Sequence, residues 1–187
     1  MRTIQCDGLK ERYENDADFA LSLRMLPAIA FVPTERVVST FEELCDSDIF
    51  PPEVQEVLDY FEDTWIGRPD RRQRRRPPQF PHEMWNVYEA VLHNLPKTNN
   101  SVEGWHRAFE EQMTACHPNI WKFIDCIKKE QALNQVRFEQ YVAGQEPPKK
   151  KKKYRDCAQR LRRLVGNYDP DVNVIDYLRG IAHNISY

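Results

Sequence analysis

One carboxylate in this chain, Glu103, lies where it could do chemistry. It falls in the first turn of an expected helix, directly after the polar segment Thr98-Asn99-Asn100. The positive end of a helix favours the ionised form of a carboxylate, which is the form that ligates a metal ion. At ~100° per residue, Glu103 is about a quarter turn from the apolar stripe of the helix, at the border between core and solvent. That stripe consists of Val102, Trp105, Phe109 and Met113.

Glu103 also has an interpretation that needs no metal. Asn100-x-x-Glu103 is close to a capping box, in which a glutamate at the third helical position accepts a hydrogen bond from the amide of the capping residue. Taken from the residues alone, this capping role is the favoured interpretation. His106 and Arg107 are the candidates to surround and position Glu103, and His106 is also a candidate DNA contact. The simpler alternatives are a half-buried histidine bonded to a neighbour, and a surface ion pair between Arg107 and Glu103.

The composition predicts a folded chain and excludes several protein classes. The hydrophobic content is 41%, with four Trp, eight Tyr and nine Phe, which is too high for a disordered chain of 187 residues. The five cysteines are widely spaced and include no Cys-x-x-Cys pair, so we expect reduced, intracellular thiols and neither a disulfide framework nor a zinc site. No apolar run is long enough to cross a bilayer, and the N-terminus lacks the apolar core of a signal peptide.

The net charge of −2 hides two concentrated basic segments. Arg68–Arg76 holds six Arg and one Asp, and Lys149–Arg155 holds five Lys and one Arg. Without these segments the chain has 15 basic and 28 acidic residues, so its body is about −13. Because an acidic body repels nucleic acid, any contact with DNA must be local and must centre on the two segments.

The arginine-rich segment is the first candidate for a DNA contact. We expect it to be a mobile loop, because Arg71–Arg76 is too charged to pack and the prolines around it keep it extended. A nuclear import signal and a merely solvated loop are the alternatives. The candidate phosphate contacts are Arg68, Arg71, Arg72, Arg74, Arg75 and Arg76.

The lysine run has a different predicted role. Five lysines follow Pro147-Pro148, a pattern that is typical of a nuclear localisation signal. A flexible charged linker is the alternative. The residues of this candidate signal are Lys149, Lys150, Lys151, Lys152 and Lys153.

Apolar periodicity predicts an all-α fold of seven or eight helices with no complete sheet. Strand signals are confined to the short run Ala28–Val32 and a loose pairing of Trp65-Ile66 with Gln79-Phe80. Two long connections are expected, a loop at Gly67–Pro81 and a linker at Gly144–Lys153. The helical stretches fall at about residues 16–30, 34–45, 53–65, 84–95, 100–113, 118–143, 154–168 and 174–185.

The segment Lys97–Arg107, with its Thr-Asn-Asn-x-x-Glu-Gly-Trp-His pattern, resembles the one that carries the third acidic residue of Mutator-like element (MULE) transposases. The resemblance extends along most of the chain, through Leu23–Ala28, Tyr60–Gly67, Pro118–Asp125 and Asp176–Asn184. Enzymes of that family cut and join DNA with an Asp-Asp-Glu triad, which binds two metal ions on an RNase H-like sheet. The resemblance makes Glu103 an ancestral metal ligand, the third member of such a triad.

The resemblance also implies a division of the chain. Residues 1–95 correspond to a helical insertion of the family, and 96–143 to the last helices of the RNase H-like core. Residues 144–153 form a basic linker, and 154–187 a C-terminal helical pair. The fold expected is therefore a remnant of a transposase that keeps the insertion and the C-terminal helices.

The chain departs from the family pattern because it has no plausible site for the two aspartates of the triad. A two-metal site needs carboxylates held rigidly around ions about 4 Å apart. The thirteen Asp of this chain include none that follows an apolar β run, and residues such as Asp16, Asp59 and Asp125 have helical or capping contexts. We therefore expect the family's two aspartates to lie upstream of Met1. The chain then has no enzymatic activity of its own and needs no cofactor, whereas the complete parent enzyme uses Mg²⁺ or Mn²⁺.

The sequence thus predicts a truncated, transposon-derived protein that associates with DNA through its basic segments. We expect it in the nucleus, otherwise in the cytoplasm, with no membrane contact. One alternative is a helical module that binds another protein. The other is an incomplete gene model of an active Asp-Asp-Glu transposase.

Overall fold

The computed structural model describes residues 9–72, 74–95, 100–113, 119–146 and 151–185. Every regular element within these ranges is a helix, and a single β-bridge joins Pro69 to Arg75. The prediction of an all-α fold without a complete sheet is confirmed. The chain divides into two compact units, residues 1–95 with 153–187, and residues 96–152. No helix in the described ranges is long and apolar enough to cross a membrane.

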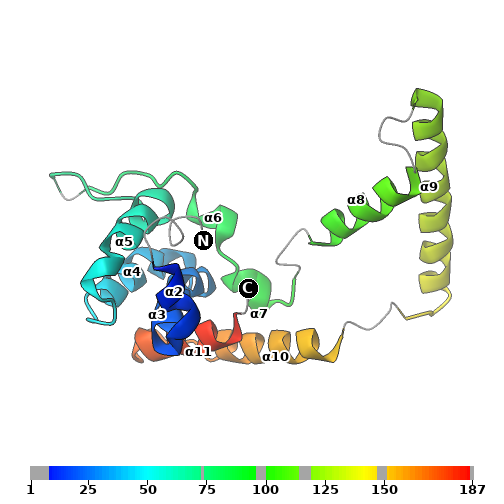
Figure 1. Cartoon of the computed structure of the whole chain (residues 1–187). Helices are drawn as coiled ribbons and strands as arrows, with labels where there is room; N and C mark the ends of the chain where they lie inside the picture. The colour runs from blue at the N-terminus through cyan, green and yellow to red at the C-terminus, as the bar shows by residue number, and fades with distance from the viewer. Residues whose placement is uncertain (1–8, 73, 96–99, 114–118, 147–150, 186–187) are drawn as a thin grey trace. The chain divides into compact units, whose positions relative to one another are not determined.

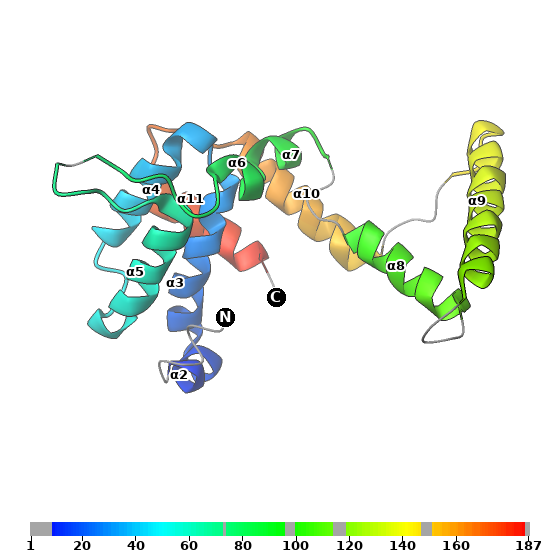
Figure 2. The same cartoon turned by 90° about the horizontal axis from the view of Figure 1, so that it is seen from above.

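The first unit is built around α3, whose start follows from its sequence. The side chain of Asp16 caps the helix by accepting hydrogen bonds from the backbone amides of Asp18 and Phe19, at 3.1 and 3.0 Å. Helix α11 packs along α3, as both Figure 1 and Figure 2 show. The α-helices of this unit are α2 (Lys10–Asn15), α3 (Ala17–Ala28), α4 (Val37–Cys45), α5 (Gln55–Phe61), α6 (His82–Trp85), α7 (Tyr88–Leu92), α10 (Lys152–Gly166) and α11 (Val174–Asn184).

Short 3₁₀ and π-helical turns complete the first unit. The apolar run 28–32, which was one of the two strand signals, instead ends α3 and continues into a 3₁₀ turn, and its side chains are buried or half-buried. A π-helical turn extends α5. These turns are η1 (Ile29–Phe31), η2 (Thr34–Arg36), η3 (Pro52–Val54) and η4 (Glu62–Ile66).

The helix predicted over residues 84–95 is broken in the structure. Two short helices, α6 and α7, replace it, because Asn86 and Val87 bond to a distant segment. The Asn86 side-chain amide donates to the carbonyl of Val32 at 2.8 Å, and the Val87 amide donates to the carbonyl of Ala30 at 2.8 Å. The side-chain oxygen of Asn86, Oδ1, then accepts from the backbone amide of Tyr88 at 3.0 Å, next to the start of α7. Tertiary hydrogen bonds therefore override the helical periodicity here.

The C-terminal helices differ from the predicted separate pair in two ways. Helix α10 begins at Lys152, inside the segment 144–153 that we expected to be a linker. Both helices belong to the same compact unit as residues 1–95, and the buried side chains of Val165 and Leu178 join its core. The Tyr177 hydroxyl also donates a hydrogen bond to the carbonyl of Phe31.

The second unit is a hairpin of two helices, α8 (Asn100–Met113) and α9 (Ile120–Val142). The Asn119 side chain caps α9 by accepting from the amide of Lys122 at 2.8 Å, and the chain leaves the helix through Gly144, whose φ is +93°. Phe109 and Cys126 are buried between the helices. The expected stripe of α8 is only partly covered, because Val102 is 51% exposed and Trp105 is 42% exposed.

Candidate nucleic-acid interface

The arginine-rich segment folds into a small hydrogen-bonded hairpin. The amide of Arg76 donates to the carbonyl of Arg68 at 3.0 Å, and the amide of Asp70 donates to the carbonyl of Arg74 at 2.8 Å. The Asp70 carboxylate accepts from the amides of Arg72 and Arg74, at 2.7 and 3.0 Å. The single acid of this segment thus organises its turn, as Asp side chains do in Asx turns. Gln73 lies outside the described residues.

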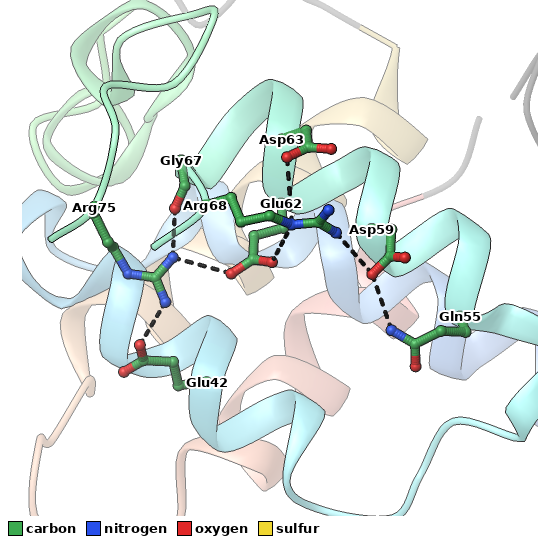
Figure 3. Close-up of polar contacts among 8 residues, drawn as sticks. All are labelled: Glu42, Gln55, Asp59, Glu62, Asp63, Gly67, Arg68 and Arg75. Atoms are coloured by element: carbon green, nitrogen blue, oxygen red, sulfur yellow. Dashed lines mark hydrogen bonds and ion pairs between the residues drawn. The ribbon is translucent and has the colours of Figure 1, made fainter. Parts of the chain in front are cut away.

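Two arginines fix this hairpin to the helices beside it. The Arg75 guanidinium contacts the carboxylates of Glu42 and Glu62, the latter at 3.1 Å, and the carbonyl of Gly67. Its side chain is 22% exposed, so the prediction that this stretch is too charged to pack is wrong for Arg75. Figure 3 shows the guanidinium between Glu42 and Glu62.

Arg68 forms the second anchor. Its guanidinium contacts Glu62 at 3.3 Å, Asp59 at 2.9 Å and Asp63 at 3.4 Å, so both arginines share Glu62 (Figure 3). The hydrogen bond to Glu62 raises the pKa of the Arg68 guanidinium. Opposite charges and hydrogen bonds to the charged form act in this direction. These contacts leave Arg68 and Arg75 engaged within the chain.

Local backbone geometry makes this arrangement possible. The π-helical turn carries Glu62, and Gly67 follows it with a φ of +90°, which glycine adopts without strain. The base of the hairpin closes where the Trp65 ring stacks on Phe80, with centroids 4.8 Å apart, and the Phe80 amide donates to the carbonyl of Thr64 at 3.2 Å. The predicted approach of Trp65 to Phe80 is therefore present as ring stacking, and the described residues form no strand there.

The remaining four arginines of the hairpin are exposed to solvent and have few carboxylate partners. Arg71, Arg72 and Arg76 are exposed, and none has a carboxylate at ion-pair distance within the described ranges. Arg74 is 72% exposed and lies 3.6 Å from Asp70. A hollow of about 350 Å³ is lined by Arg71 and Arg76 together with Asp63 and Asp70. The six predicted contacts thus divide into two anchors and four exposed cations.

The lysine run is only partly described. Lys149 and Lys150 lie outside the described residues, so their part of the predicted localisation signal has no structural account. Lys151 is exposed just before α10, and Lys152 and Lys153 are exposed in its first turn. Part of the expected flexible linker is therefore helical.

The structure places Glu103 on α8 with an exposed side chain. No ion pair joins it to Arg107 in the described part of the chain, so the expected pair is absent. His106 is exposed rather than half-buried, and its ring meets the Trp105 ring edge-on, at 5.1 Å between centroids. The side chain of Asn100 and the residues Thr98-Asn99 are not among those described, so the capping box stays a prediction.

The described surroundings of Glu103 include no metal-binding cluster. Within the described ranges, no group of three or more His, Cys, Asp or Glu side chains is arranged to hold a metal ion. A Cβ added at Gly104 would meet nothing within 4 Å, so the described residues make no close approach to this backbone. Glu103 therefore stands without carboxylate partners from the described residues.

Sequence reasoning missed one buried carboxylate, Glu130, in the second unit. It accepts hydrogen bonds from Trp105 Nε1 at 3.0 Å, Asn134 Nδ2 at 3.2 Å and Gln112 Nε2 at 3.4 Å. Glu130 lies seven residues after Phe123 and four after Cys126, which is the spacing of one helix face. That spacing could have indicated its burial between α8 and α9.

Comparison with protein-family models, with curated protein sequences and with solved structures finds no match to this chain.

Proposed function

We propose that this chain associates with duplex DNA through the exposed arginines of the 68–76 hairpin. The observation that carries the proposal is that some arginines of the hairpin are ion-paired within the chain and others are exposed. Arg68 and Arg75 pair with carboxylates of the first unit, and this leaves Arg71, Arg72 and Arg76 exposed on an anchored hairpin. A preorganised set of cations binds phosphates with less ordering cost than a flexible one. The resemblance to MULE transposases supports DNA as the polyanion.

The physical basis of this binding is the release of counterions from DNA. Each neutralised phosphate lowers the slope of log K against log[salt] by about 0.9. Three arginines would therefore account for a slope of roughly −2.7, on top of the contribution of other cations. The acidic body of the chain repels DNA elsewhere, so the contact stays local.

The test is a salt titration of duplex binding by fluorescence anisotropy. Changing Arg71, Arg72 and Arg76 together to Gln should flatten the slope by roughly 2.7. The matched control changes Lys122, Lys128 and Lys129 on α9, which are also exposed, and should leave the slope nearly unchanged. An unchanged slope in the arginine variant would remove the hairpin from the interface.

We also propose that the chain is a MULE transposase remnant that does not cut DNA. Four aspartates of the first unit have structural roles that support this proposal. Asp16 caps α3, Asp59 and Asp63 pair with Arg68, and Asp70 organises the arginine hairpin. Incubation of supercoiled DNA with the chain and Mg²⁺ or Mn²⁺ should give no nicking. Metal-dependent nicking that Glu103→Gln abolishes would contradict the proposal and favour the active-enzyme alternative.

For the lysine run we propose a role in nuclear import. The support is the exposure of Lys151, Lys152 and Lys153, which leaves them accessible to a receptor. A fusion to a large fluorescent protein is needed, because a chain of 22.2 kDa can diffuse through nuclear pores. The fusion should accumulate in the nucleus, and changing all five lysines to Gln should abolish accumulation. Equal accumulation of both forms would refute the role.

A second candidate function, self-association, is favoured by a largely exposed face of α9. Apolar side chains recur there with alternating four- and three-residue spacing, which is the heptad pattern of helices that pair. Two polar residues, Gln131 and Asn134, interrupt the pattern in the middle, where such residues fix register. Ile120 and Phe138 are each 62% exposed. The positions are Ile120, Ile124, Ile127, Gln131, Asn134, Phe138 and Tyr141.

The occupant proposed for this face is the same face of a second copy. Light scattering after size exclusion should then show a dimer, and Ile127→Glu with Phe138→Glu should convert it to a monomer. Trp121→Glu is the control, because Trp121 is 74% exposed on another side of α9. A monomer at tens of micromolar concentration would rule out the self-association.

A further inference from the structure

Helix α10 carries a row of cations that extends well beyond the lysine run. Between residues 151 and 163 the only acidic side chain is Asp156. All the basic side chains in this interval are exposed. They are Lys151, Lys152, Lys153, Arg155, Arg160, Arg162 and Arg163.

The opposite side of α10 is fixed in the core of the first unit. Leu161 is 7% exposed and Val165 is 1% exposed. The Cys157 thiol donates to the carbonyl of Asn184 at 3.1 Å. At ~100° per residue, Lys152 and Arg163 fall opposite Leu161 and Val165, whereas Arg155 and Arg162 lie on one exposed flank of the helix. Packing therefore holds the cationic face outward along the helix.

The charge on this face is not compensated within the described ranges. None of its seven cations forms an ion pair with a described carboxylate. Arg160 donates to Asn184 Oδ1 at 2.7 Å, but that partner is neutral. Arg68 and Arg75 of the arginine hairpin, in contrast, are paired with carboxylates. The uncompensated charge of α10 therefore exceeds that of the hairpin.

We propose that the outward face of α10 is a phosphate-binding surface for duplex nucleic acid, separate from the arginine hairpin. This inference rests on the proposed DNA association and adds a second contact to it. From Lys152 to Arg163 the helix rises about 16 Å, at ~1.5 Å per residue. A DNA duplex presents one negative charge per about 1.7 Å of its axis, so a rigid cationic row of this length faces several phosphates.

Other polyanionic partners fit the face less well. A basic amphipathic helix binds a membrane by inserting its apolar side, and that side of α10 is buried in the core. A protein interface needs apolar side chains at its centre, and the outward row from Arg155 to Arg163 has none. Phosphate contacts need only charge and donors, which this row supplies.

The test changes Arg155, Arg162 and Arg163 together to Gln in the full chain. Glutamine has a helix propensity close to that of arginine, so α10 should persist, and circular dichroism checks this. We expect the log K versus log[salt] slope for duplex DNA to flatten by roughly 2.7 and the affinity at 50 mM salt to fall by at least about tenfold. Changing the same three residues to Lys preserves charge and should preserve the slope.

The outcomes separate this inference from the proposed hairpin contact. Figure 1 and Figure 2 show the hairpin and α10 on different sides of the first unit, so the two effects should add. A flattened slope in the α10 variant alone supports the α10 surface and removes the hairpin. A flattened slope in the hairpin variant alone overturns the inference while leaving the proposed function standing. If neither variant changes the slope, both fail.

Two competitors identify the ligand class. Vesicles with a large fraction of phosphatidylserine, and poly-glutamate at equal charge, are titrated against the DNA complex. Duplex DNA should be displaced only weakly by either. Preferential binding of the vesicles or the polypeptide, lost in the α10 Gln variant, would overturn the assignment to nucleic acid.

Discussion

Trp105 donates a hydrogen bond from its indole nitrogen to the buried carboxylate of Glu130 over 3.0 Å, and this bond joins α8 to α9. Glu130 is 7% exposed, so the bond is largely shielded from water. The Trp105 ring also stacks on Phe109, with 5.3 Å between centroids. The two-helix unit is therefore closed by the hydrogen bonds of Glu130 with Trp105 and Gln112, beside a small aromatic cluster.

Removal of the Trp105 donor should loosen the packing of α8 against α9. Trp105→Phe keeps the ring that stacks on Phe109 but takes away the hydrogen bond to Glu130. A hydrogen bond to a charged group contributes about 1.5–3 kcal/mol, so amides of α8 should exchange with solvent at least tenfold faster. Hydrogen exchange measured by mass spectrometry on the full chain reports this.

Trp121→Phe is the matched control for that prediction. Trp121 is 74% exposed, and no ring contact or hydrogen bond of its side chain occurs in the described part of the chain. Exchange in α8 should be the same as in the parent chain. Equal exchange in the two variants would show that the bond to Glu130 does not hold α8 against α9.

Two glycines should respond in opposite ways to alanine. Gly67 has a φ of +90°, and a Cβ there would lie 2.1 Å from the carbonyl oxygen of Arg76. Gly67→Ala should therefore destabilise the first unit by more than about 1 kcal/mol. Gly104→Ala meets no atom within 4 Å and should stabilise α8 by up to about 1 kcal/mol, because alanine is the better helix former. Thermal unfolding of both variants measures these changes. Melting temperatures that shift equally and in the same direction would contradict the two predictions.

The helices that bury one continuous stripe could be predicted from the sequence. Helices α3, α4, α5 and α11 fall on expected stretches, and Asp16 caps α3 as its position indicated. The break at Asn86 could not be predicted, because it depends on a hydrogen bond to Val32, 54 residues earlier. Local periodicity carries no information on such a partner.

In the candidate site, too, the role of a residue depends on tertiary contacts that the local sequence does not reveal. Arg68 and Arg71 look alike in sequence, and both were expected to contact phosphates. Their roles differ because the π-helical turn and Gly67 bring Glu62 to Arg68, whereas no described carboxylate pairs with Arg71. The outward cations of α10, in contrast, follow helical spacing and could have been found from the sequence.

Loss of the Arg75 anchor should release the arginine hairpin. Arg75→Ala removes the contacts with Glu42, Glu62 and the carbonyl of Gly67, and it leaves both carboxylates without this cation. The melting temperature should fall by a few degrees, and amides of 68–76 should exchange faster. Arg76→Ala is the control, since Arg76 is exposed without a described ion pair. Equal melting temperatures for the two variants would mean that Arg75 is no anchor.

The thiol of Cys45 should respond to pH unlike an exposed thiol. Burial raises its pKa to about 11, from an ordinary value of 9.0, and the negative charges of Glu62 and Asp46 act in the same direction. At pH 9 about half of an ordinary thiol is ionised, compared with about one hundredth of Cys45. Alkylation of Cys45 by iodoacetamide should therefore be about 50-fold slower in the folded chain than in urea.

The pH profile separates the raised pKa from simple shielding of the sulfur. A raised pKa moves the midpoint of the alkylation rate toward pH 11, whereas shielding lowers the rate with the midpoint still near pH 9. Between these values the unfolded chain has lost the thiol proton and the folded chain has kept it. Stability must therefore decrease as the pH rises from 9 to 11. Cys45→Ser has no such proton, so its free energy of unfolding should fall less over this interval. The same fall in both chains would contradict the raised pKa.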